Sequence, residues 1–577
     1  MPSALTYPGV YVEEIPSGVH TITGVATSIT AFIGSAPRGP VNTAITIDNL
    51  GDFQRIFGGL WVKSTLGYAV QDFFANGGSQ AIVVRLYHAD PGNPKADPAV
   101  DAPETTAVLT VGAMEFSAAS PGTWGNNLRV TIDQNNPSSD VATSLGVATT
   151  ALFNLTVRDT GTGATEQYLN LTVKDTPRRV DRILSANSAL LVYSGNNGVP
   201  APTTAIAAGS DPLSTLEAVV ATAQAALLAA QIANPGGDVT TQQKAVTDAT
   251  TALNTALTKA STAVSDGLAL SAADFLPNNG QAAKQGMYAL EQADLFNLLV
   301  IPPYRSFTDT LDTDTIVVSS AATYCENRRA MLLVDAPKDW TTKDTAKNKF
   351  SDANTDYVGT RSKNAALFFP RLLEANPLHN YQVETFAASG AVAGIFARTD
   401  AQRGVWKAPA GLQATFNGIS GFSVPLTDAE NGELNPLGIN CLRSFPVLGQ
   451  VVWGARTLRG ADQLADDYKY IPVRRTALFI EESLYRGLKW VVFEPNDEPL
   501  WAQIRLNAGT FMQTLFRKGA FQGSSPRDAY FVKCDNETTT QADIDLGIVN
   551  VVVGFAPLKP AEFVVIELQQ IAGQTTT

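Results

Sequence analysis

The chain has 577 residues, 45% of them hydrophobic, which is enough for several domains with real cores and excludes a disordered protein. Its formal net charge is −13, and no run of lysines and arginines forms a stripe that could follow a phosphate backbone, so nucleic acid is not an expected partner. The cysteines Cys325, Cys441 and Cys534 lie far apart without CxxC spacing and predict neither a zinc site nor a disulfide framework.

Targeting signals are not evident in the sequence. No lysine or arginine precedes Arg38, so the N-terminus lacks the basic region of a secretory signal. Apolar runs such as residues 298–301 and 548–555 are too short to cross a bilayer. We therefore expect synthesis in a reducing cytoplasm and no direct membrane insertion.

The chain opens with an N-terminal arm, residues 1–20, in which residues 10–15 form a β-type run between two prolines. After it, the pattern predicts a strand at 28–34, helices at 48–57 and 67–76, and a strand at 81–87. The glycine-rich turn after the first strand lacks the GxxxxGK[ST] spacing of a phosphate loop, so no nucleotide site is expected.

Two segments then interrupt the α/β pattern. Residues 90–200 alternate short apolar runs with Gly, Asn and Asp turns and predict a β-rich module, with strands at 107–111, 128–132, 152–157 and 168–173. Residues 211–267 are rich in alanine and threonine at helical spacing and predict a helical hairpin, with a low-complexity linker as the alternative.

The α/β pattern returns over residues 274–410, which we expect to form one discontinuous domain with residues 21–89. The predicted elements are a buried strand at 296–301, a helix at 315–327, strands at 330–335 and 365–369, and a helix at 390–400. Asp335 ends a strand, where α/β enzymes often place catalytic groups. No histidine, serine elbow or second carboxylate accompanies it in a known spacing.

Residues 411–577 predict a C-terminal α+β domain. Helices are expected at 475–488 and 500–518, the second capped by Asn496 or Asp497, and residues 490–493 read as a buried strand. The chain ends on an apolar strand at 562–568. This strand and the run at 10–15 pair either within their own subunit or, by strand donation, with a sheet of a neighbouring copy.

Many separate blocks resemble contractile tail sheath proteins of phages and phage-tail-like injection systems, in the order of that family. They are IGSAPRG at 33–39, FFANGG at 73–78, VRL at 84–86, GIN at 438–440, RSFP at 443–446, VWGART at 452–457, YIPVRR at 470–475, IEES at 480–483, WVVFEP at 490–495, DID at 543–545 and APLKPAEF at 556–563.

The resemblance implies a structural protein that polymerises helically around an inner tube and contracts from a metastable extended state. Its implied fold is an α/β sheath core interrupted by a β-rich outer module and a helical hairpin, plus a C-terminal α+β domain with strand-exchanging arms. The implied partners are further copies of the chain, the inner tube protein, the baseplate and the tail terminator or cap proteins. Assembly would take place in the bacterial cytoplasm, and the product would be a virion tail or a released or anchored contractile particle.

The candidate functional residues follow from this resemblance and from the terminal strands. Inter-subunit arms are expected at Val10, Tyr11, Val12, Glu13, Ile15, Phe563, Val564, Val565, Ile566 and Leu568. The end of the helix at 500–518 is the candidate contact to the inner tube, through Arg517 and Lys518.

Residues for catalysis or metal binding are not indicated. The three histidines are scattered, and the adjacent pairs Glu481–Glu482 and Asp466–Asp467 point apart on any regular element, so they predict solvated faces or inter-subunit salt bridges. We expect no catalytic residue, cofactor or metal. The alternative function is an α/β hydrolase or a surface-binding protein with a β-rich accessory module.

Overall fold

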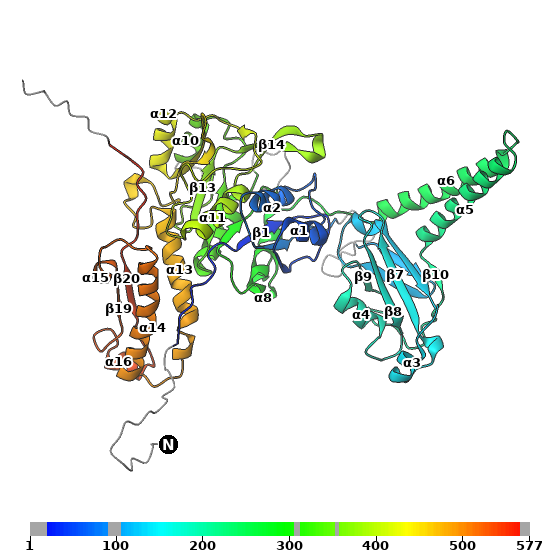
Figure 1. Cartoon of the computed structure of the whole chain (residues 1–577), viewed down its shortest axis with the longest axis horizontal. Helices are drawn as coiled ribbons and strands as arrows, with labels where there is room; N and C mark the ends of the chain where they lie inside the picture. The colour runs from blue at the N-terminus through cyan, green and yellow to red at the C-terminus, as the bar shows by residue number, and fades with distance from the viewer. Residues whose placement is uncertain (1–19, 91–105, 305–311, 352–356, 566–577) are drawn as a thin grey trace, which may run out of the picture.

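A computed structural model describes residues 20–90, 106–304, 312–351 and 357–565. Figure 1 shows three parts in a row: a central α/β domain, a β-rich module with a long helical hairpin on one side, and a C-terminal domain on the other. The fold is therefore a mixed α/β multidomain arrangement with one large, mainly parallel sheet and several small antiparallel sheets.

The central sheet has eight strands in the order β18-β17-β13-β12-β11-β1-β3-β2. Its six inner strands pair in parallel, and the edge strands β2 and β18 pair antiparallel with their neighbours. The strands are β1 Thr30–Gly34, β2 Ala44–Ile47, β3 Ala81–Arg85, β11 Leu298–Val300, β12 Met331–Asp335, β13 Ala365–Phe369, β17 Ile439–Phe445 and β18 Gly449–Val452.

Both faces of this sheet are covered, as continuous apolar strands require. One face packs against α1, α2 and α11, and the other against α9 and α10. These helices are α1 Leu50–Phe57, α2 Leu66–Ala75, α9 Thr315–Asn327, α10 Lys343–Ser351 and α11 Ser389–Arg403. Shorter elements of this domain are α7 Ala272–Phe275, α8 Gly280–Ala283, α12 Asp428–Leu434 and the small sheet of β14 Leu372–Asn376, β15 Gln382–Phe386 and β16 Gly421–Phe422.

The sequence predicted most of these strands within a few residues but missed two features. The β-α-α-β opening contains an additional edge strand, β2. The expected boundary between residues 410 and 411 is also wrong, because β17 pairs in parallel with β13 and β18 continues the same sheet. The C-terminal domain therefore begins after β18.

The β-rich module contains two antiparallel sheets, ordered β10-β6-β7-β8 and β4-β5-β9, around its own apolar core. Its elements are β4 Val108–Val111, β5 Met114–Ala118, β6 Leu128–Asp133, α3 Ser139–Leu145, β7 Phe153–Asp159, β8 Thr165–Leu171, α4 Val180–Asn187, β9 Leu191–Tyr193 and β10 Gly209–Ser210. All four predicted strands of this module are present.

The hairpin consists of α5 Pro212–Ala233 and α6 Thr240–Ala263 and points away from the rest of the molecule (Figure 1). Asp211 caps α5, which contains a single charged residue, Glu217. Among the described residues, α5 is the one helix that is long and apolar enough to cross a membrane, with 22 residues and a mean hydropathy of 1.5. The short apolar runs considered in the sequence did not include it. It meets these criteria by length and composition only, and its side chains are mostly exposed in the structure.

The C-terminal domain pairs two long helices with a two-stranded ribbon. The elements are α13 Ile471–Gly487, α14 Glu498–Arg517, α15 Pro526–Ala529, β19 Tyr530–Lys533, α16 Gln541–Asp545 and β20 Val552–Phe555. As predicted, the side chain of Asp497 caps α14 by accepting the Leu500 amide. The ribbon, with strands β19 and β20, packs one face on α14.

The buried strand predicted at 490–493 does not form. Residues Lys489–Val491 make a 3-10 turn, and Phe493 has a left-handed φ of 75° and a fully exposed side chain. The apolar run suggested a strand, but only Trp490 and Val491 pack inward, against the start of α14.

A pair of buried carboxyl groups joins the small sheet to α2. Asp72 of α2 and Glu374 of β14 are both buried, and burial raises the pKa of both, that of Glu374 to about 7. Protonation of this pair therefore persists to a pH well above the usual range of carboxyl groups. Because both pKa values are raised above those of the unfolded chain, this contribution to stability is complete at low pH and is lost as the pH rises through 7.

We predict that Glu374→Gln reduces this pH dependence, since glutamine keeps a donor for Asp72 but does not ionise. The melting temperature of the wild type should fall between pH 5 and pH 8, and the variant should lose about half of that fall. Differential scanning calorimetry measures both. Glu384→Gln on β15 is the matched control, because the pKa of Glu384 is lowered by the Asn376 amide and its contribution changes only at lower pH.

Candidate functional site

The start of the described chain lies along α13 of the C-terminal domain. Ile22 packs so closely against Gly487 that a Cβ at position 487 would clash with the Ile22 side chain. The Val25 amide donates to Ser483 Oγ at 3.2 Å. His20 stacks on Trp490 with 4.3 Å between ring centroids. The N-terminal segment is thus fixed to the C-terminal domain from residue 20 onward, and the predicted arm residues Val10, Tyr11, Val12, Glu13 and Ile15 lie outside the described residues.

The other end of the chain is tied down at Glu562. Its two carboxylate oxygens accept from Nε and Nη2 of Arg456 at 2.8 and 2.6 Å, and the Tyr470 hydroxyl donates to it at 3.1 Å. Arg456 is completely buried beside β17, where its amide and carbonyl bind the Asn440 side chain. This bidentate ion pair fixes the root of the C-terminal tail to the central domain.

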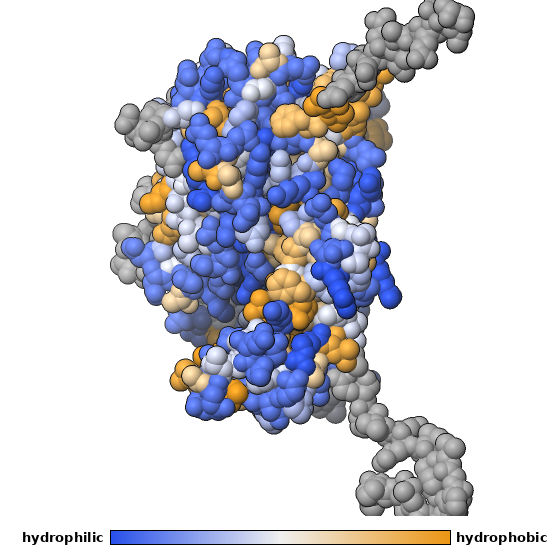
Figure 2. All heavy atoms as spheres, turned by 90° about the vertical axis from the view of Figure 1, so that its left-hand side faces the viewer, coloured by the Kyte–Doolittle hydropathy of each residue, from blue (hydrophilic) through white to orange (hydrophobic). Residues whose placement is uncertain are grey.

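Immediately after this anchor the tail becomes exposed. Phe563, Val564 and Val565 are 75%, 82% and 82% exposed, and residues 562–565 belong to no strand. Figure 2 shows apolar surface where the chain leaves toward residue 566. The part of the predicted strand that the structure describes is thus unpaired within the subunit, and Ile566 and Leu568 lie outside the described residues.

The β19–β20 ribbon lies in the same domain. Tyr530, Val532, Val553 and Phe555 pack toward α14, whereas Phe531 and Val552 are exposed. Within the described parts of the chain, its two outer edges pair with no further strand. A two-stranded ribbon with free edges can accept additional strands by main-chain hydrogen bonding.

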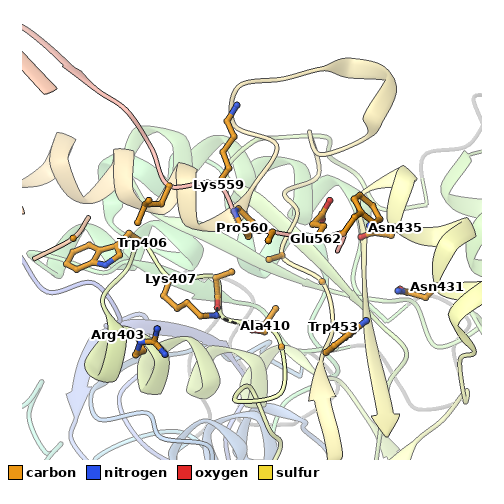
Figure 3. A pocket seen from close by; sticks show the side chains of 18 of the residues that line it. Arg403, Trp406, Lys407, Ala410, Asn431, Asn435, Trp453, Lys559, Pro560 and Glu562 are labelled. Carbon is orange, nitrogen blue, oxygen red and sulfur yellow. Dashed lines mark hydrogen bonds between the residues drawn. The ribbon is translucent and has the colours of Figure 1, made fainter. Parts of the chain in front are cut away.

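The predicted tube-contact residues lie where α14 ends. Arg517 and Lys518 are both exposed, and Lys518 also lines a cleft of about 750 Å³ between the C-terminal and central domains. The tail passes along this cleft with Lys559, Pro560 and Glu562 (Figure 3).

The cleft contains basic residues that the sequence did not single out. Arg403, Lys407 and Lys559 line it together with Lys518 and two tryptophans. Partial burial, assisted by the neighbouring charge of Arg403, lowers the pKa of Lys407. These cations span more than 150 positions of sequence, and only the packing of α11, α14 and the tail brings them together, so no local motif could have revealed the site.

The carboxylates considered for chemistry have structural partners. Asp335 is partly buried and accepts from the amide and hydroxyl of Ser389 at 2.8 and 2.6 Å, which holds the start of α11. Glu481 pairs with Arg474, Glu482 with Arg329 and Arg486, and Asp466 with Arg459. The expectation of a solvated face or an inter-subunit pair is wrong for Glu482, which is buried and paired within the chain. Glu481 is exposed, as expected of a solvated face. The described residues contain no group of acids, histidines and cysteines suited to a metal ion.

Sequence-family comparisons match most of the chain. The phage tail sheath protein central domain matches residues 278–458, and the phage tail sheath C-terminal domain matches residues 464–571. A domain described as DUF2586, N-terminal domain, matches residues 8–285. The first two domains meet just after β18, in agreement with the domain boundary seen in the fold. No protein of curated function is detectably similar in sequence.

Solved structures share the fold across almost the whole chain. The helical sheath of the anti-feeding prophage in its contracted state is 21% identical, covers 98% of this chain and 100% of its own, and gives a TM-score of 0.53. A chain from the anti-feeding prophage baseplate is also 21% identical, with coverages of 99% and 100% and a TM-score of 0.51. The sheath tail protein of Listeria innocua is 11% identical, with coverages of 93% and 96% and a TM-score of 0.52.

We predict that Glu562→Gln loosens the tail. The variant loses the charge of a bidentate pair to a buried arginine and should be about 2 kcal/mol less stable. Hydrogen exchange should speed up over residues 556–565, and denaturant titration gives the stability change. Asp462→Asn, which removes the half-exposed second partner of Arg456, should have a smaller effect. Unchanged exchange in Glu562→Gln would show that the ion pair does not hold the tail.

Proposed function

This chain belongs to the phage tail sheath family, and on that premise we propose that its two terminal segments join it to neighbouring copies by strand exchange. As a member of this family, it is a contractile sheath subunit of a phage tail or contractile injection system and has a structural, non-enzymatic role. The proposal concerns how the subunits stay connected while the sheath changes length.

The observation that carries the proposal is the exposed segment Phe563–Val565 beyond a fixed anchor. Burying one such side chain is worth roughly 1.5–3 kcal/mol, so leaving three consecutive ones in water is unfavourable unless another surface covers them. Within the subunit, these three side chains could be covered only if the tail paired with a nearby free strand edge, and residues 562–565 form no such pairing. The alternating side chains of residues 562–568 instead suit insertion into a sheet of a second copy.

The receiving element in this proposal is the β19–β20 ribbon. Isolated two-stranded ribbons are only marginally stable, and added strands on either edge would complete a larger sheet. One added strand would come from residues 562–568 of one neighbour and the other from residues 10–15 of a second neighbour. Main-chain bonds of this kind persist while side-chain contacts between subunit bodies are exchanged, which suits a hinged tether.

Contacts in which one copy gives a strand and the next receives it are heterologous, so they propagate into a helical polymer and do not close into a dimer. We infer that the extended sheath is metastable and that contraction buries more interface between subunits, so that no cofactor is required. The inferred partners are further copies of the chain, an inner tube protein, the baseplate, and a terminator or cap protein. A similar chain of 21% identity comes from a baseplate structure of the anti-feeding prophage, which supports the baseplate contact.

In this proposal the two parts that flank the central domain face opposite sides of the assembly. The β-rich module and hairpin, residues 90–200 and 211–267, would lie on the outside of the assembly, because they project away from the domain that exchanges strands (Figure 1). The C-terminal domain would face the inner tube, with Arg517 and Lys518 as candidate contacts. A polar contact there allows release when the sheath widens.

We predict that removing either arm prevents assembly without unfolding the subunit. Chains lacking residues 1–19, or ending at Glu562, keep their cores and should have wild-type circular dichroism spectra but form no ordered tubes in negative-stain micrographs. A chain ending at Gln570 is the matched control and should assemble. Normal tubes from either arm deletion would contradict the strand-exchange proposal.

A second prediction concerns the tube contact. Arg517→Glu should still form empty sheath but reduce the fraction of tube-filled sheath at least several-fold during co-assembly at low salt, since this cation would no longer attract tube carboxylates. Lys518 is left unchanged in this test because it also lines the cleft between the domains. Electron microscopy counts filled and empty particles. If the Arg517→Glu chain encloses the tube as readily as wild type, Arg517 at the end of α14 is not the contact.

A further inference from the structure

The cleft between the C-terminal and central domains has an unbalanced positive charge. Arg403, Lys407, Lys518 and Lys559 line it, although the chain as a whole carries a net charge of −13. Within the described part of the chain, no carboxylate lies within 4.0 Å of any of these four cations. Such a concentration of like charge favours an anionic occupant.

The cleft's own chemistry limits what this occupant can be. Arg403 donates to the Gln413 side chain, and Lys407 donates to the carbonyls of Ala408 and Ala410, so both are held in place without being neutralised. Glu562 is the one carboxylate in the lining, and it is already bound by Arg456. Trp406 and Trp453 add apolar walls (Figure 3), which suit a segment carrying acidic and apolar side chains together.

We propose that this basic cleft receives the N-terminal arm of a neighbouring copy, whose adjacent side chains Glu13 and Glu14 would face opposite walls of the cleft. These two glutamates are the only charged side chains among residues 1–19, and they directly follow Tyr11 and Val12. The arm therefore matches the cleft in charge and in its apolar content. The inference rests on the strand-exchange proposal and adds to it the site that selects the acidic part of the arm.

The arm of the same subunit is too short to fill the cleft. The first described residue is His20, which stacks on Trp490. Trp490 packs at the start of α14. The cleft lies at the other end of α14, whose 20 residues span about 30 Å. The six residues from His20 back to Glu14 extend at most roughly 20 Å and would also have to reverse direction. Glu13 and Glu14 must therefore come from another copy.

The main experiment exchanges the charges of the two partners in the full-length chain. Glu13→Lys with Glu14→Lys, or Arg403→Glu with Lys559→Glu, should each reduce the number of ordered tubes at least tenfold. Combining all four substitutions should restore at least half of the wild-type number. Lys489→Glu with Arg527→Glu is the matched control, because both are exposed cations of the C-terminal domain outside the cleft, and it should assemble normally.

A crosslinking experiment tests the location directly. The three native cysteines are buried. The double variant Glu13→Cys with Lys559→Cys therefore adds one thiol on the arm and one in the cleft, and the native thiols do not compete with them. Mild oxidation of assembled sheath should give a ladder of covalent multimers on a denaturing gel, and each single-cysteine variant should give none of that ladder.

The outcomes separate this inference from the strand-exchange proposal. If the chain without residues 1–19 fails to assemble while Glu13→Lys with Glu14→Lys assembles normally and no ladder forms, the arm is exchanged but does not use the cleft, and the inference is overturned. If the chain without residues 1–19 assembles normally, both are overturned. Loss of assembly in both charge-reversed pairs without rescue by their combination also overturns the inference.

Discussion

The contact between Arg475 and Asp400 fixes the C-terminal domain to the central domain. The guanidinium of Arg475, on α13, makes a bidentate pair with Asp400 of α11 at 2.8 and 2.6 Å and also donates to the Thr27 carbonyl at 2.8 Å. Both side chains are buried. One side chain thus connects the C-terminal domain, the central domain and the N-terminal segment. Removing either partner would leave a charge buried and unpaired, which typically costs about 3–5 kcal/mol of stability. Separating the two domains at this point is therefore unfavourable.

The β-rich module is attached by a comparable set of polar contacts. Arg85, at the end of β3, is buried and donates to the carbonyls of Ala36, Gly39 and Pro121. Arg38 pairs with Asp159 of β7 at 3.1 Å. The bond from Arg85 to Pro121 and the pair of Arg38 with Asp159 cross from the central domain to the module and help to fix the module in place.

Features set by local sequence could be predicted, and features set by distant pairing could not. The capping of α14 by Asp497, the apolar stripe along it and the strand β13 follow from residues within one element, and the sequence predicted each of them. The placement of β17 depends on its pairing with β13 some 70 positions earlier, so the expected domain boundary was wrong. At 490–493 the composition favoured a strand, but no neighbouring strand exists there to pair with it. The basic cleft is invisible in sequence for the same reason, since Arg403 and Lys559 meet only in the folded chain.

The anchor of the C-terminal tail determines where a mechanical load enters the subunit. Arg456 holds Glu562 on one side and, through its main chain, the Asn440 side chain of β17 on the other, and Asn440 also donates to the Leu367 carbonyl of β13. Tension applied beyond Val565 therefore passes into the eight-stranded sheet before it reaches β20. The two-stranded ribbon of the C-terminal domain is therefore shielded from that force. A stretched tail would move the whole subunit and would not peel β20 from α14.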